Sequence, residues 1–149
     1  MDKRSTESLQ LKMKNYVFLL VVTGVGCLID GVFSFSVRID SYQDLMIEYG
    51  TLIQLIIKDI TLACFGVITL FIARNIKRNK LFVASTATLV GLLGWLLILG
   101  SISSSVAEAI WDAPHISHVI EDAVGIILIV LSRILNIGIK MKEEIDLTI

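Results

Sequence analysis

Charged residues interrupt stretches of this sequence that are otherwise apolar. Lys58 and Asp59 are adjacent within the apolar run 51–73, and Asp30 lies within the run 16–37. Charge within the hydrocarbon region of a membrane is costly, and such residues mark ion pathways, proton relays or contacts between helices. We therefore expect function to reside in an intramembrane polar cluster. Its members are Asp30, Lys58, Asp59, Glu121, Asp122 and Arg133.

Three of these charges are expected at similar depths. At about 1.5 Å per residue, Asp30 lies about 10 Å from the outer end of its run, and Lys58 and Asp59 about 10–12 Å along theirs. Antiparallel helices joined by a short loop pack side by side, so Asp30 and Lys58 are predicted to form an ion pair. The Asp59 side chain points about 100° away from that of Lys58. It therefore needs a different hydrogen-bond donor, or its carboxyl group must be protonated and neutral. The cluster either fastens helices together or lines a path for protons or cations.

A second group of polar residues surrounds the two histidines. If the fourth helix extends back to about residue 115, His115, His118 and Asp122 project from one face. Two imidazoles and a carboxylate suit a transition metal such as zinc, copper or iron, with Asp112 completing the shell. Alternatively, histidines at this boundary cap the helix or meet lipid headgroups. A haem is not expected, because both histidines lie on one segment and cannot clamp opposite faces of one iron.

Arg133 follows Asp122 by three helical turns, so both residues are predicted on one stripe, with Arg133 about 16 Å deeper. It points into the helical bundle or toward a partner, or its long side chain reaches the headgroups.

The elements that must position these residues are transmembrane helices. Of the 149 residues, 55% are hydrophobic, and the mean hydropathy is +0.82, which is too apolar for an ordinary soluble domain. Each of four apolar runs is close to the about 20 residues that a helix needs to cross a bilayer. The sequence therefore predicts an all-α fold, a single membrane domain over residues 1–149 that forms a four-helix transmembrane bundle. The expected helices are 16–37, 51–73, 81–102 and 119–139.

Basic residues predict the orientation of these helices. They concentrate before the first run, between the second and third runs, and after the fourth. The two remaining loops contain one lysine or arginine, Arg38. Because basic loops remain on the cytoplasmic side, both termini are expected to be cytoplasmic in a multi-pass protein of the plasma membrane. Small residues such as Gly24, Gly26, Ala87 and Gly91 are expected where helices approach closely.

Several functional classes are disfavoured by the sequence. It contains no nucleophile elbow, phosphate-binding loop, zinc-protease motif or dinucleotide fingerprint, so an enzyme acting alone is not expected. The basic clusters beside the helices are explained by topology, and no nucleic-acid partner is expected.

Three functions remain as hypotheses. The first is an accessory or assembly subunit of a larger membrane complex, which docks partners through the intramembrane polar cluster. The second is a small ion-coupled or metal-handling transporter, and the third is a metal-binding component of a membrane oxidoreductase. The expected partners are the lipid bilayer and other membrane subunits, or further copies of this chain.

Overall fold

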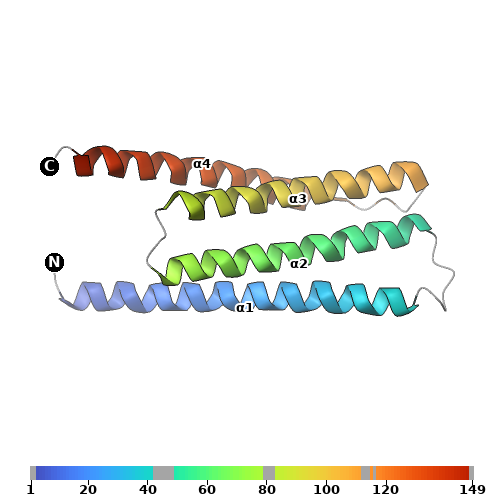
Figure 1. The fold of residues 1–149 in the computed structure, drawn as a ribbon, viewed down its shortest axis with the longest axis horizontal. Helices are drawn as coiled ribbons and strands as arrows, with labels where there is room; N and C mark the ends of the chain where they lie inside the picture. The colour runs from blue at the N-terminus through green and yellow to red at the C-terminus, as the bar shows by residue number, and fades with distance from the viewer. Residues whose placement is uncertain (1–2, 42–48, 79–82, 112–114, 116, 148–149) are drawn as a thin grey trace.

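The chain folds into long α-helices joined by short connections (Figure 1). The computed structural model describes residues 3–41, 49–78, 83–111, 115 and 117–147. All regular structure in these residues is helical, which confirms the predicted all-α class. All four helices end later than predicted, and the third begins at Ala84 and not at the predicted residue 81. The helices are α1 (Lys3–Ser41), α2 (Tyr49–Lys77), α3 (Ala84–Trp111) and α4 (Val119–Leu147).

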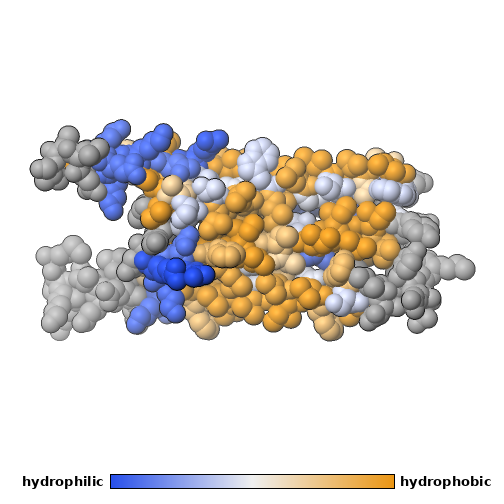
Figure 2. Space-filling model, viewed as in Figure 1, coloured by the Kyte–Doolittle hydropathy of each residue, from blue (hydrophilic) through white to orange (hydrophobic). Residues whose placement is uncertain are grey.

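Each of these four helices contains a segment long and apolar enough to cross a membrane. Figure 2 shows apolar side chains over the middle of the molecule and hydrophilic ones gathered toward one end. This distribution is that of a multi-pass membrane protein, since a bilayer demands an apolar belt between polar ends. The candidate spans are Met13–Val37, Gly50–Lys77, Ala84–Trp111 and Val119–Ile145.

The helices pack against one another in sequence order. Among the described residues, α1 contacts α2, α2 contacts α3 and α3 contacts α4, and no other pair of helices brings Cα atoms within 8 Å. The start of α1, the end of α2, the start of α3 and the end of α4 lie at the same end of the molecule (Figure 1), as the up-and-down topology predicts. The compartment that this end faces stays a prediction. Because no Cα atoms of α1 and α4 lie within 8 Å of each other in the described part of the chain, each of these helices packs closely against one other helix.

The interior of the protein is small and polar rather than large and apolar. The largest fully buried side chains are Gln54 and Thr86, and the buried apolar set includes Ala73, Ala87 and Ala107. Apart from Ile72, Leu93 and Ile139, which are buried, most large aliphatic and aromatic side chains of the described residues lie toward the outside. Lipid tails solvate a leucine as well as a protein interior does, so helix association depends on close packing and polar contacts.

Glycines bring consecutive helices into backbone contact. A Cβ atom added to Gly66 of α2 would lie 2.6 Å from the carbonyl oxygen of Gly24 in α1, and one on Gly31 would lie 2.7 Å from the carbonyl oxygen of Asp59. At the interface between α3 and α4, a Cβ on Gly94 of α3 would lie 2.5 Å from the carbonyl oxygen of Gly125 in α4. No side chain fits at these crossings, so glycine is required there.

The small residues singled out in the sequence differ in their roles. Gly24 lies at the crossing of α1 and α2, and Gly91 lies against Ser132 of α4. Ala87 is buried and its carbonyl oxygen accepts a hydrogen bond from the Ser132 hydroxyl at 2.8 Å. Gly26 does not pack against another helix of this chain, since a Cβ there would meet nothing within 4 Å, and contact of such a residue with another subunit stays a prediction. One helical face contacts a neighbour, and Gly26 lies two residues, about 200°, away from Gly24 on that helix.

The different surroundings of Gly66 and Gly26 predict how the fold responds to a methyl group added at each position. Gly66→Ala should destabilise the fold by about 1–3 kcal/mol, because the methyl group overpacks a backbone contact. Gly26→Ala, the matched control, should be neutral or slightly stabilising, because alanine favours helix where space is open. Thermal unfolding of both variants in the same detergent checks this. Equal stability of the two variants would contradict the packing described.

Candidate functional site

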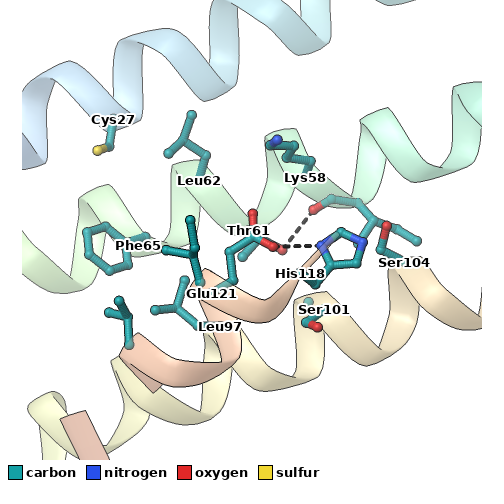
Figure 3. Close-up of a pocket in the computed structure, with 14 residues that line it drawn as sticks. Cys27, Lys58, Thr61, Leu62, Phe65, Leu97, Ser101, Ser104, His118 and Glu121 are labelled. Atoms are coloured by element: carbon teal, nitrogen blue, oxygen red, sulfur yellow. Dashed lines mark hydrogen bonds and ion pairs between the residues drawn. The ribbon is translucent and has the colours of Figure 1, made fainter. Parts of the chain in front are cut away.

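A pocket of about 310 Å³ lies between the helices and is lined by all of them (Figure 3). Cys27 reaches it from α1, and the remaining lining residues come from α2, α3 and the start of α4. Among its lining residues, Ile120 is exposed on the molecular surface. The α2 and α3 residues that line it are Ile57, Lys58, Thr61, Leu62, Phe65, Leu97, Gly100, Ser101 and Ser104.

A histidine and a glutamate form the closest polar pair in this pocket. His118 Nδ1 lies 2.6 Å from Glu121 Oε2, and the two residues precede and begin α4. The His118 carbonyl oxygen accepts the Asp122 N–H at 3.0 Å, so His118 occupies the N-cap position of the helix. Glu121 is then the third helical residue, the position from which an acidic side chain reaches back toward the N-cap.

This pairing leaves the other nitrogen of the imidazole available. An ionised carboxylate only accepts hydrogen bonds, so the Glu121 carboxylate selects the tautomer with the proton on Nδ1. The Nε2 atom of neutral His118 then carries a lone pair. It is buried and has no hydrogen-bond partner among the described residues. The His118 side chain as a whole is only 10% exposed, whereas that of Glu121 is 38% exposed.

Hydroxyl groups line the same pocket. Ser101 and Ser104 of α3 are buried, and neither side chain forms a hydrogen bond with another described residue. Thr61 of α2 donates to the Ile57 carbonyl oxygen at 2.8 Å and can still accept one further bond. In Figure 3, Leu62, Phe65 and Leu97 lie toward one end, away from His118 and Ser104. The pocket therefore has a polar end and an apolar end.

The structure brings only part of the intramembrane polar cluster together, since Lys58 and Glu121 line the pocket and the other members do not. Asp30 and Lys58 are both exposed, and within the described chain they form no ion pair with each other, so that predicted pairing is wrong. The reason is helical phase: Gly31 faces α2 and Asp59 is buried, so the residue preceding each of them is turned about 100° away.

Three cluster members differ in their surroundings. Asp59 is 4% exposed and has a polar partner. Asp122 is partly buried, and its Oδ1 has no hydrogen-bond partner among the described residues. Arg133 is exposed and forms no polar contact within the part of the chain that the structure describes.

The described residues alone do not assemble the predicted metal site. The α4 helix begins at Val119, so the assumption that His115 and His118 share a helical face is wrong. His115 Nδ1 instead lies 2.7 Å from Glu108 Oε1, and its side chain is 81% exposed. Among described residues, no group of three or more histidine, cysteine or acidic side chains could hold a metal ion. Asp112 lies outside the described residues, so the full ligand set stays a prediction.

Sequence reasoning missed the serines of the pocket. Ser101 and Ser104 follow each other by three residues in the most apolar helix, and Gly100 beside them packs against Thr61 of α2. Polar residues on one face of such a helix were the available signal.

Comparison of the chain with protein-family models, curated proteins and solved structures gives no match. Its function is therefore argued from the geometry of the chain.

The contact between His118 and Glu121 predicts a measurable tautomer. Neutral His118 should carry its proton on Nδ1, because the Glu121 carboxylate accepts a hydrogen bond from that nitrogen. Nitrogen chemical shifts of the labelled protein in lipid report the protonated atom directly. Glu121→Leu should remove this preference at His118. Glu108→Leu, the control, should affect only His115, and an Nε2-protonated His118 in the unmodified protein would contradict the geometry.

Proposed function

We propose that this protein is an accessory subunit of a membrane complex, which binds partner helices through charges within its spans. One observation carries the proposal: Asp30, Lys58 and Arg133 are exposed within candidate spans and have no polar partner among the described residues. A lone charge at the centre of a membrane helix costs about 2.5–3.5 kcal/mol on insertion scales. An oppositely charged or polar group on a partner helix removes much of this cost.

Asp30 makes the strongest demand for such a partner. The side chains of Lys58 and Arg133 are long enough to extend toward the headgroups. Asp30 has a short side chain and lies seven residues before the end of its span at Val37, about 10 Å from that end. A basic or hydrogen-bonding group on a neighbouring helix satisfies it best.

The arrangement of the helices provides room for a partner. Among the described residues α1 packs closely on α2 alone and α4 on α3 alone, so both outer helices have faces on which further helices can pack. The exposed apolar side chains of α1 and α4 suit lipid or transmembrane helices equally. The charges then determine which helices bind. We expect a basic or amide side chain opposite Asp30 and an acidic one opposite Lys58 or Arg133.

Removal of the Asp30 charge tests this function. Polar contacts between membrane helices contribute about 0.6–2 kcal/mol, so Asp30→Leu should weaken co-purification with native partner chains about threefold to thirtyfold. Asp30→Asn retains hydrogen-bonding capacity and should retain most of the association. Native mass spectrometry after gentle extraction measures the stoichiometry of the co-purifying chains.

The matched control is Lys14→Gln, which removes an exposed charge from the same helix near the start of its span. It should leave the complex intact. A homo-oligomer with no foreign chain at fixed stoichiometry would overturn the accessory function, as would equal complexes from Asp30→Leu and Lys14→Gln.

We propose an ion-coupled transporter as a second candidate, because the His118 and Glu121 pair lies in a pocket that all four helices line. Adjacent imidazole and carboxylate groups are a common proton relay within membranes. Asp59, which the sequence suggested for this role, does not line the pocket.

Proton flux distinguishes this second candidate. In liposomes with an imposed membrane potential and an internal pH dye, the native chain should admit protons, and Glu121→Gln should reduce the rate at least tenfold because the amide cannot exchange a proton. Glu143→Gln alters an exposed residue near the end of α4 and should have no effect. Rates equal to those of protein-free liposomes would eliminate transport of protons.

A further inference from the structure

The pocket between the four helices has the size and composition of a small-molecule site. Its volume of about 310 Å³ lies at the lower end of the about 300–1,000 Å³ that is usual for ligand pockets. An apolar cavity of about 150 Å³ already binds benzene in a soluble protein. Aliphatic and aromatic side chains form most of the walls, and the polar groups are few and lie together.

The polar end of the pocket offers a particular set of hydrogen bonds. His118 Nε2 is buried without a partner among the described residues, and the Glu121 carboxylate places the proton on the opposite nitrogen. Nε2 therefore requires a donor from outside the described residues. The hydroxyls of Ser101 and Ser104 also have no partners there, and each can donate one hydrogen bond. An unsatisfied buried polar atom such as Nε2 costs about 1–3 kcal/mol, so a ligand that donates a hydrogen bond to it is favoured.

The charges of the pocket limit the ligand further. Glu121 and Lys58 both line it, so the pocket holds one group of each charge and favours neither an anionic nor a cationic ligand. A neutral ligand needs no counter-charge there. A ketone can accept from a serine but cannot donate to Nε2, whereas a hydroxyl group can do both.

We propose that this pocket binds a neutral, membrane-dissolved apolar molecule that carries a hydroxyl group. The hydroxyl donates to His118 Nε2 and accepts from Ser101 or Ser104, and the hydrocarbon portion lies against Leu62, Phe65 and Leu97. This site goes beyond partner docking, because Asp30 and Arg133 do not line the pocket, although Lys58 does. Asp30→Leu, which tests docking, should therefore leave this binding intact.

Photo-crosslinking of the full chain in lipid nanodiscs tests the proposal. One probe is a long-chain primary alcohol with a diazirine in its chain, and the second is the same molecule without the hydroxyl group. The alcohol should label lining residues of α2, α3 or α4, and unlabelled alcohol should compete with it. A single hydrogen bond contributes about 0.5–1.5 kcal/mol, so the probe without the hydroxyl should label the pocket about twofold to tenfold less.

Variants identify the groups that hold the hydroxyl. His118→Phe should reduce labelling by the alcohol to the level of the second probe. His115→Phe is the matched control, because His115 is exposed and does not line the pocket, and it should have no effect. Ser101→Ala combined with Ser104→Ala keeps His118 and should also reduce labelling, which covers the case in which His118→Phe does not fold.

Two results would overturn the inference. Equal labelling of the pocket by both probes would mean that bulk lipid chains fill it without recognition of a hydroxyl. Labelling by the alcohol that persists in the double serine variant and in a folded His118→Phe would mean that the hydroxyl binds elsewhere.

Discussion

Close backbone contact between consecutive helices is the constraint on which the rest of this structure depends. In a bilayer, burial of large apolar side chains between helices gains little, since lipid surrounds them just as well. Stability must come from short-range packing and from polar contacts that lipid cannot supply. Gly24, Gly31 and Gly66 provide this packing between α1 and α2, and Gly94 and Gly125 provide it between α3 and α4. Side chains of any size at these crossings would separate the helices.

The glycine contacts also set the rotation of each helix about its axis, and rotation decides what each charge faces. With Gly31 against α2, Asp30 cannot share that interface. With Asp59 buried, Lys58 is turned outward. Asp30 and Lys58 therefore do not neutralise each other, although they lie at similar depths. The exposed charges follow from packing, and they are the basis for proposing that partner helices complete the protein.

The pocket has a related origin. Within the described residues the helices pack closely only in sequence order, so the backbones of α1 and α4 do not approach each other and close the space between them. The start of α4 then brings His118 and Glu121 to the pocket, because an N-cap residue and the third helical residue lie on the same turn. The charges within the spans and the histidines before α4 are separate in the sequence. Lys58, His118 and Glu121 bring these two groups together in the pocket.

The sequence by itself determined the class of this protein. Four long apolar runs predict four membrane-spanning helices, because a bilayer leaves no other way to satisfy the backbone of such segments. Sequence also indicated which polar residues are unusual, since a charge within an apolar run is evident from its neighbours alone. Tertiary structure decided their partners. The ion pair of Asp30 with Lys58 and the shared helical face of His115 and His118 were reasonable from depth and spacing, and both are wrong. Depth follows from residue number, whereas direction depends on which helical face packs and on where a helix begins, and both depend on contacts with other helices.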